Sequence, residues 1–341
     1  MRGTASWRHA WRGAALAFVL VVSNAGAGVA APLTIRMGWV ATPASLIPIL
    51  FAKPGVARHV GVSYVVEPYH FKGSPLQITA LQSGDLDIAA LGFSSFSLAV
   101  ENAGLGDLRI IADEIENGVP GYGGSEFAVL KDGPVRSIAD LKGKVLATNG
   151  IGGGLDMTVK AMLLKHGLVD KRDYAVVEIA FPNMKAVLLE GKAALVDFAL
   201  PWSQDPEFHA KSRILFTTNE AMGPVALSFW TARTGFLAKN RAAVADLLED
   251  YVRVIHWYLD PAHHAEAVAI VANYVKVPPA ILQDWLFTRK DQYRNPDGVP
   301  DLDAVTRNIR AQQQLGLIRA ALDAKAYADL GPITAAARRV K

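Results

Sequence analysis

The chain of 341 residues contains no cysteine. This absence excludes disulfide bonds, thiolate metal sites and a cysteine nucleophile. It also excludes the lipid-modified cysteine with which bacterial lipoproteins begin. Any binding or catalysis must therefore depend on other side chains and on backbone groups.

Long apolar runs are scarce as well. Near the amino terminus, residues 14–22 (AALAFVLVV) form an apolar run of nine, whereas a transmembrane helix needs about 20 residues. Three arginines precede this run, and small residues follow it at 24–31. A basic segment, a short apolar run and a region of small residues are together typical of a signal peptide.

The small residues allow signal peptidase to cut after Ala27 or Ala30. We therefore assign residues 1–30 to a signal peptide and expect the mature protein to begin at Gly28 or Ala31. The predicted location is the periplasm, in soluble form and without a lipid anchor.

Without the signal peptide, the chain has no excess of positive or negative charge. The chain has 35 Lys and Arg against 32 Asp and Glu, but three of the arginines lie in residues 1–30, which contain no acid. The mature chain is therefore formally neutral. Nothing in it indicates the concentrated basic surface that nucleic-acid binding needs, so we expect no nucleic-acid partner.

The most informative segment that is present is a helix, a glycine and a strand in succession. Residues 75–82 have the pattern of a helix, which begins with proline and stops at Gly84, a residue suited to the left-handed position after a helix. Residues 86–91 then form a buried apolar run that predicts a strand. This strand brings Gly92 and the residues after it to the carboxyl end of a sheet, where open α/β folds bind ligands.

A similar unit recurs about a hundred residues later, with a helix at 184–190, a glycine at Gly191 and a strand at 194–200. Further strands are expected at residues 33–40, 62–66, 108–112, 126–131, 144–148, 176–179 and 224–232. Further helices are expected at residues 46–52, 137–143, 156–166, 240–260, 265–274, 280–287 and 302–315. The alternation of strands and helices predicts parallel sheets covered by helices. Residues 113–125, rich in glycine and acid, are expected to connect two lobes.

This pattern resembles the periplasmic solute-binding proteins of ABC importers, in the nitrate, sulfonate and taurine group. The resemblance is carried by residues 83–92 (SGDLDIAALG), 137–144 (SIADLKGK) and 188–203 (LLEGKAALVDFALPWS). It implies an α/β fold of the two-lobed type II periplasmic-binding-protein class, with a mostly parallel sheet in each lobe and two crossovers. It places residues 33–125 and 229–341 in one lobe and residues 126–228 in the other.

The resemblance also indicates a ligand site at the loops that follow the strands. Helix amino ends at such loops carry about half a positive charge and free N–H groups, which suits an anion. The ligand-binding residues expected from the matching loops are Thr42, Pro43, Ser45, Phe93, Ser94, Asn149, Gly152, Gly153, Pro201, Trp202, Gly223 and Pro224. Related proteins often carry an acidic or polar residue just before the position of Pro201. Leu200 stands there in this chain, which argues against an amine such as taurine.

The glycine-rich residues 149–154 (NGIGGG) invite a nucleotide-binding interpretation. They lack the Gly-Lys-Ser/Thr ending of a P-loop and the third glycine of the dinucleotide motif. An anion-accepting loop is favoured here, and a tight turn without a ligand is the alternative.

We therefore expect an extracytoplasmic solute-binding protein, not an enzyme, that captures a small organic anion between two lobes. A sulfonate-like or carboxylate-like ligand would be delivered to an ABC permease of the inner membrane after hinge closure. The protein is expected to be a monomer without a cofactor or a metal. Two alternatives remain: an enzyme on the same fold, of the pyrimidine-precursor or menaquinone-pathway type, and a sensory or TRAP-type receptor.

Overall fold

The computed structural model describes residues 31–200 and 202–341. The expected signal peptide, residues 1–30, lies outside the described residues. Residues 32–341 form one compact unit. No helix in the described part of the chain is long and apolar enough to cross a membrane.

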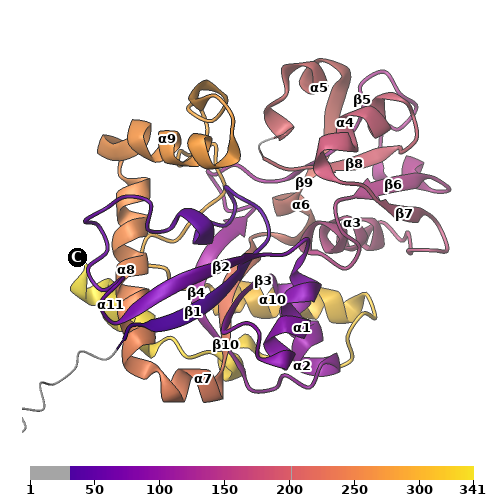
Figure 1. Ribbon diagram of the computed structural model, residues 1–341. Helices are drawn as coiled ribbons and strands as arrows, with labels where there is room; N and C mark the ends of the chain where they lie inside the picture. The colour runs from indigo at the N-terminus through magenta and orange to yellow at the C-terminus, as the bar shows by residue number, and fades with distance from the viewer. Residues whose placement is uncertain (1–30, 201) are drawn as a thin grey trace, which may run out of the picture. The chain divides into compact units, whose positions relative to one another are not determined.

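The strands form two mixed sheets of five strands each (Figure 1). The first sheet has the order β2-β1-β3-β10-β4. Its strands are β1 (Leu33–Trp39), β2 (Tyr64–His70), β3 (Ile88–Leu91), β4 (Leu108–Asn117) and β10 (Val225–Arg233). β1 is parallel to β2 and β3, whereas β10 is antiparallel to both β3 and β4.

The second sheet repeats this arrangement in the order β7-β6-β8-β5-β9. Its strands are β5 (Glu126–Leu130), β6 (Val145–Thr148), β7 (Ala175–Glu178), β8 (Leu195–Phe198) and β9 (Ser212–Thr217). β6 is parallel to β7 and β8, and β5 is antiparallel to β8 and β9. In both sheets the antiparallel strand is the one with which the chain arrives from the other sheet.

The chain crosses between the sheets twice, and the two crossings lie side by side. The first runs through residues 118–125, and the second through α6 (Thr218–Met222). Asn219 donates its side-chain N–H to the carbonyl of Gly118 at 2.6 Å, and the Thr218 N–H donates to Ser125 at 3.2 Å. The predicted two-lobed type II fold is thereby confirmed. The sequence places the second lobe boundary at residue 228, whereas β10 belongs to the first sheet from Val225 onward.

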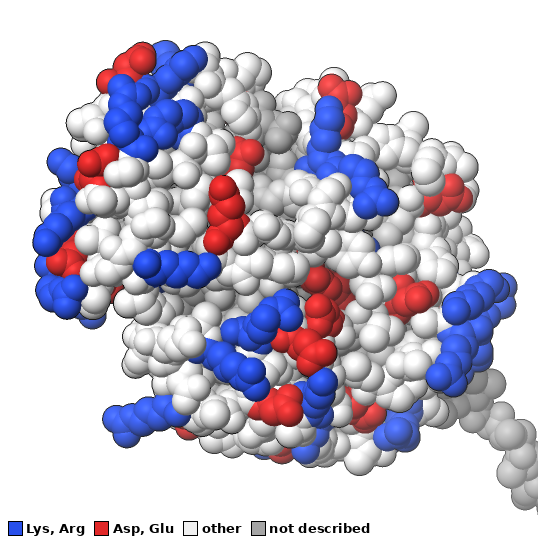
Figure 2. All heavy atoms as spheres, turned by 180° about the vertical axis from the view of Figure 1, so that it is seen from behind, with Lys and Arg blue, Asp and Glu red and all other residues white. Residues whose placement is uncertain are grey.

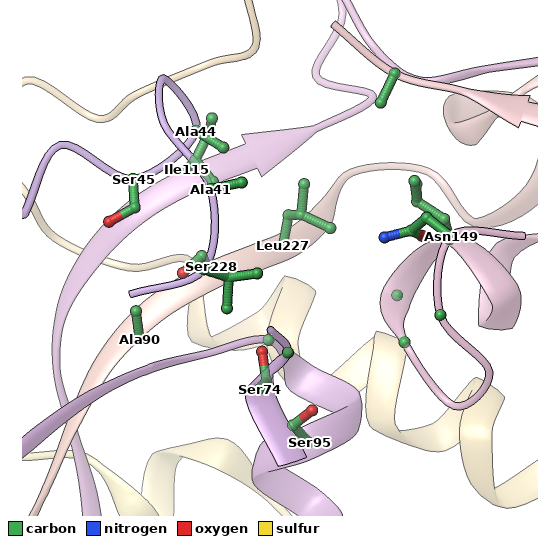
Figure 3. Close-up of a pocket in the computed structure, with 18 of the residues that line it drawn as sticks. Ala41, Ala44, Ser45, Ser74, Ala90, Ser95, Ile115, Asn149, Leu227 and Ser228 are labelled. Carbon is green, nitrogen blue, oxygen red and sulfur yellow. The ribbon is translucent and has the colours of Figure 1, made fainter. Parts of the chain in front are cut away.

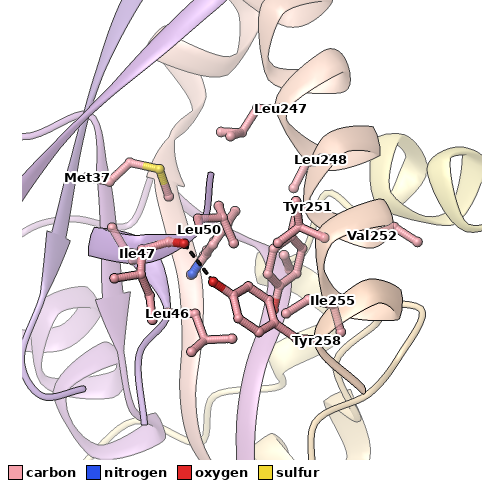
Figure 4. Packing of buried hydrophobic residues seen from close by; sticks show 14 of the residues in the cluster. Met37, Leu46, Ile47, Leu50, Leu247, Leu248, Tyr251, Val252, Ile255 and Tyr258 are labelled. Carbon is pink, nitrogen blue, oxygen red and sulfur yellow. Dashed lines mark hydrogen bonds between the residues drawn. The ribbon is translucent and has the colours of Figure 1, made fainter. Parts of the chain in front are cut away.

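The carboxyl-terminal helices cover one face of the first sheet. These are α8 (Arg241–Leu259), α9 (His264–Val275) and α11 (Gly331–Arg339), with α7 (Thr234–Lys239) leading into them. Figure 4 shows side chains of α8 packed against Met37 of β1 and against the segment after it. The Tyr258 hydroxyl donates to the Ile49 carbonyl at 2.9 Å, which ties α8 to that segment. The other face is covered by α1 (Ser74–Ser83), α2 (Phe93–Asn102) and α10 (Leu302–Gln314).

The second sheet has smaller cores on its two faces. α3 (Gly154–Lys165) and α6 pack on one face, and α4 (Phe181–Leu189) and α5 (Pro206–Lys211) pack on the other. Aromatic stacking fills both cores, as in the Phe127–Phe216 pair with ring centroids 4.5 Å apart. Acidic and basic side chains are mixed on the face shown in Figure 2, as expected from their near balance in the sequence.

Both helix–glycine–strand units predicted from the sequence are confirmed. α1 ends at Gly84, whose φ is 78°, and α4 ends just before Gly191, whose φ is 69°. The sheet strands β3 and β8 follow them. A positive φ favours glycine, so these two stops were readable from sequence alone.

Three predicted helices are wrong. Residues 137–143 form only a 3-10 turn at Ile138–Leu141. Residues 46–52 form only a 3-10 turn at Ile47–Ile49, and residues 280–287 form a 3-10 turn at Pro279–Ile281 followed by further turns. In residues 280–287 the positive φ of 58° at Phe287 ends any helical backbone there, but the turns begin already after Ile281. The remaining 3-10 turns are Trp202–Gln204, Pro261–His263 and Ala324–Tyr327.

The predicted connector at 113–125 is wrong in its first part, because β4 continues to Asn117. Three acids in this stretch suggest a solvated loop, yet Asp113, Glu114 and Glu116 are all buried. β4 therefore carries its acidic residues into the interior, next to the first crossing.

Candidate ligand-binding site

A cavity of about 430 Å³ is lined by residues of both lobes. Its walls come from the segments that follow β1, β2, β3, β6, β7 and β8, together with parts of β4 and β10 (Figure 3). Its volume lies within the range of about 300–1,000 Å³ that is usual for small-molecule sites. The cavity therefore has the size and position expected for a ligand held between two lobes.

Four helices begin at or beside this cavity: α1, α2, α3 and α4. Their amino-terminal capping positions are Gly73, Gly92, Gly153 and Ala180, and none of these supplies a side-chain hydrogen bond to its helix. Among the other helices, α5, α6 and α10 begin under capping side chains of Asp205, Thr217 and Asp301, whereas α7, α8, α9 and α11 also begin without one. The first-turn N–H groups of the four helices at the cavity thus lack capping side chains, and the positive ends of the helix dipoles meet at one place.

The start of α2 lies directly against β10. A Cβ atom at Gly92 would come within 2.6 Å of the carbonyl oxygen of Leu227. Glycine is thus required for the close approach, independently of any ligand. The Leu227 side chain also reaches Gly154 at the start of α3, so it lies where both lobes meet the cavity.

The glycine-rich loop before α3 is held from beneath by acidic side chains. Asn149 donates its backbone N–H to Asp197 at 2.9 Å, and Gly152 donates its N–H to Asp156 at 2.8 Å. The Lys160 ammonium in turn lies 2.8 Å from the Asp156 carboxylate. Burial raises the pKa of Asp197 to about 7, and the hydrogen bonds from Asn149 and Thr148 only partly oppose that shift.

The opposite part of the cavity has a polar wall built around Glu114 of β4. One carboxyl oxygen accepts a hydrogen bond from Ser45 at 2.5 Å, and the other accepts one from Ser228 of β10 at 2.6 Å. Burial raises the pKa of Glu114, while the two serines and nearby Arg294 act in the other direction. Arg294 also fixes the loop after β1, because its guanidinium donates to the carbonyls of Pro43 and Ala44.

An aromatic pair forms the second lobe's apolar contribution. Trp202 stacks on Phe181 with ring centroids 4.8 Å apart and an interplanar angle of 15°, and both residues line the cavity. At the entrance of the first lobe, the exposed Lys72 lines the cavity and forms no ion pair within the described residues. The site can thus accept an apolar body as well as a charged group.

Most of the residues predicted from the sequence come together at this cavity. It is lined by Thr42, Pro43, Ser45, Ser94, Asn149, Gly153 and Trp202. Pro201 lies outside the described residues.

Four predicted residues do not line the cavity. Phe93 is fully buried in the core beneath α2, and the N–H of Gly152 is turned to Asp156. Gly223 and Pro224 lie in the second crossing, because β10 carries the chain further before it reaches the cavity at Leu227 and Ser228.

Of the polar wall, the sequence predicts Ser45 but not Glu114 or Ser228, and it does not predict the start of α1 as part of the site. The sequence places Glu114 in a connector and Ser228 at a lobe boundary. The only local signal was Ile115, an apolar residue between two acids, which is compatible with a strand that has a buried face.

Comparison with protein-family models matches residues 30–272 to the NMT1-like family. This match spans well over half of the chain. The chain belongs to the NMT1-like family. No curated protein sequence matches it significantly.

Solved structures similar to this NMT1-like protein include two proteins that are named for binding small anions. The alkanesulfonate-binding protein SsuA from Xanthomonas axonopodis pv. citri, bound to MOPS, is 17% identical, with 89% of this chain and 100% of that chain covered and a TM-score of 0.68. The nitrate-binding protein NrtA from Synechocystis PCC 6803 is 16% identical, with 91% and 89% covered and a TM-score of 0.68. The desulfurization enzyme DSZB is also similar, at 16% identity, 91% and 100% coverage and a TM-score of 0.62. At such identities the shared feature is the fold, which serves both binding proteins and an enzyme.

Proposed function

We propose that this NMT1-like protein is the extracytoplasmic solute-binding component of an ABC importer. It captures a small organic anion, sulfonate-like or carboxylate-like, between its two lobes and delivers it to a permease of the inner membrane. The observation that carries the proposal is the convergence of four helix amino ends without capping side chains on one cavity lined by both lobes.

The helix ends support an anion because their N–H groups and dipoles favour negative charge. The Trp202–Phe181 pair and Leu227 support an organic body, since nitrate alone would need only polar contacts. SsuA and NrtA, which share the fold, are named for alkanesulfonate and nitrate, so an anionic ligand is in keeping with those relatives.

The ligand class is tested by a thermal-shift screen of sulfonates, carboxylates, nitrate, taurine and pyrimidines. A ligand present at 100 times its dissociation constant should stabilise the protein by about 2.7 kcal/mol. We expect organic sulfonates or carboxylates to raise the melting temperature and their uncharged amides to leave it unchanged. If only nitrate or a cationic pyrimidine raises it, the proposed ligand class is wrong.

Binding without catalysis is tested on the same samples. A ligand that stabilises the protein should be recovered chemically unchanged after prolonged incubation, as judged by mass spectrometry. Conversion of the ligand would instead favour the enzyme alternative, for which DSZB provides a precedent of fold only.

Export is tested by intact-mass analysis of the protein from a periplasmic extract. The mature chain should begin at Gly28 or Ala31. A chain that begins at Met1 and stays in the cytoplasm would overturn the importer proposal.

A further inference from the structure

Three residues from separate elements form the polar wall of the cavity. Glu114 lies on β4, Ser228 lies on the neighbouring strand β10, and Ser45 lies in the loop after β1. All three line the cavity, and Figure 3 shows Ser45 and Ser228 on the side away from Asn149. Glu114 is only 2% exposed, so its carboxyl group is shielded from bulk water.

The serine hydroxyl protons of this wall already take part in hydrogen bonds. A serine hydroxyl has a single proton to donate, and both serines donate theirs to Glu114, at 2.5 Å and 2.6 Å. The Ser45 oxygen also accepts a long hydrogen bond of 3.4 Å from the Ile47 N–H. The Ser228 oxygen is half-buried and accepts none within the described residues. With Glu114 ionised, the wall therefore offers lone pairs to the cavity and no free proton.

The carboxyl group of Glu114 has no cationic hydrogen-bond partner in the described part of the chain. Arg294 is nearby, but its N–H groups donate to the carbonyls of Pro43, Ala44 and Glu114 rather than to the carboxyl oxygens. A buried carboxylate without such a partner is costly, and a donor from a ligand would reduce that cost. An anionic group at the same place would be repelled.

The anion-favouring helix ends and this acceptor wall belong to one cavity. We infer that the ligand is dipolar: it carries a hydrogen-bond donor, N–H or O–H, that meets Ser228 and Glu114 while its anionic group meets the helix ends. Glu114 is then the specificity-determining residue. This inference rests on the proposed function and narrows its ligand class. It also revises the expectation drawn from Leu200, because an acid that can receive a donor comes from β4 in the other lobe.

The test uses pairs of sulfonates or carboxylates in which one member carries the donor and the other lacks it. Suitable pairs are 4-hydroxybenzenesulfonate with 4-methoxybenzenesulfonate, 4-hydroxybenzoate with 4-methoxybenzoate, and taurine with ethanesulfonate. Affinities are measured by calorimetry. In each pair that binds, we expect the donor-bearing member to bind about tenfold or more tightly, because the other leaves buried acceptors unpaired.

Two variants show whether Glu114 is responsible. In Glu114→Gln, the amide NH₂ donates to one serine, and that serine can then donate its own proton to the ligand. The ratio of the two affinities within each pair should therefore fall towards one. Ser228→Ala removes the half-buried acceptor while Glu114 stays, and it should also reduce the preference. Should Glu114→Gln fail to fold, as judged by circular dichroism, Ser228→Ala decides.

Ser95→Ala is the matched control, since Ser95 lines the cavity at the start of α2. This variant should weaken both members of a pair alike and keep their ratio. Equal affinities within every pair for the wild-type protein would overturn the inference and leave the proposed function standing. Failure of every organic anion to bind would overturn both.

Discussion

Asp250 in the first lobe and Asp197 in the second are both fully buried, but their carboxyl groups are satisfied to different degrees. Asp250 on α8 accepts hydrogen bonds from the backbone N–H groups of residues 58–60 and from the Tyr64 hydroxyl, all between 2.7 and 3.0 Å. Asp197 accepts only two, from Thr148 and Asn149, and its second oxygen has no partner among the described residues.

The two aspartates therefore stabilise their lobes in different ways. Asp250 joins a carboxyl-terminal helix to the segment before β2, and its four donors hold that part of the first lobe in one arrangement. Asp197 holds the loop that begins α3 beside the cavity, and its charge depends on pH near neutrality because burial raises its pKa to about 7. The first lobe thus has a fully hydrogen-bonded buried acid that does not line the cavity, whereas the second lobe has a buried acid with one unpaired oxygen beneath the loop that lines it.

The largest effect is expected for Asp250→Ala. This variant would leave four donors without their partner, so the free energy of unfolding should fall by about 4 kcal/mol or more. Urea unfolding measures the change. Asp250→Asn, which keeps one accepting oxygen, should lose less. A loss below about 1 kcal/mol in Asp250→Ala would show that water replaces the carboxylate and would remove the contrast with Asp197.

A smaller effect that depends on pH is expected for Asp197→Asn. Because the pKa of Asp197 is raised on folding, its contribution is fully present below the unfolded pKa and is lost as pH rises to about 7. Relative to the wild type, the variant should therefore gain roughly 2–4 kcal/mol in unfolding free energy between pH 4 and pH 8. Urea unfolding at several pH values tests this gain.

Asp205→Asn provides the control in the same lobe. Lys185 and backbone N–H groups lower the pKa of Asp205, so this variant should show no gain as pH rises. A flat difference between Asp197→Asn and the wild type would mean that Asp197 does not titrate in this range.

Measurements of ligand affinity can compare the contributions of the two lobes to binding. Ser45→Ala removes a polar group from the first lobe's wall, and Trp202→Ala removes the aromatic face that the second lobe contributes. Each should weaken binding about tenfold or more without unfolding the protein. Calorimetry measures the affinity, and Leu164→Ala, at an exposed position of α3 that does not line the cavity, serves as the control. Wild-type affinity in either variant would remove that lobe's loop from the site.

The smallest expected effect is a decrease in the radius of gyration when the ligand binds. If the lobes close on the ligand, small-angle scattering should show a lower radius of gyration at saturation. Asp197→Asn should still close, since Asn149 can donate to the new side-chain carbonyl. Identical curves with and without a saturating ligand would count against hinge closure.

Local signals in the sequence predict the units of this fold well. Gly84 and Gly191 each mark a helix end because the backbone there is left-handed, and the order of strands and helices indicates the two sheets. The same signals locate the strand ends after which Ser94, Asn149 and Trp202 reach the cavity.

The polar wall could not be predicted in this way, because its physical cause is not local. Glu114 is tolerated inside the protein only with Ser45, Ser228 and Arg294 around it, and these lie 69, 114 and 180 residues away in the chain. Read alone, a run of acids indicates a solvated loop. The contacts that reverse this interpretation exist only after β10 has entered the sheet between β3 and β4.

The position of β10 has a consequence for the order in which the lobes form. Every strand of the second sheet lies between residues 126 and 217, so this lobe has all its pairing partners as soon as that stretch of chain is present. In the first sheet, β3 and β4 are joined only through β10 (Val225–Arg233), which begins more than a hundred residues after the end of β4. This sheet therefore cannot be completed until β10 is present. Pairing over such long sequence separations is slow. The inserted lobe should therefore be the earlier intermediate in refolding, and the lobe that contains β1 should be the last to complete.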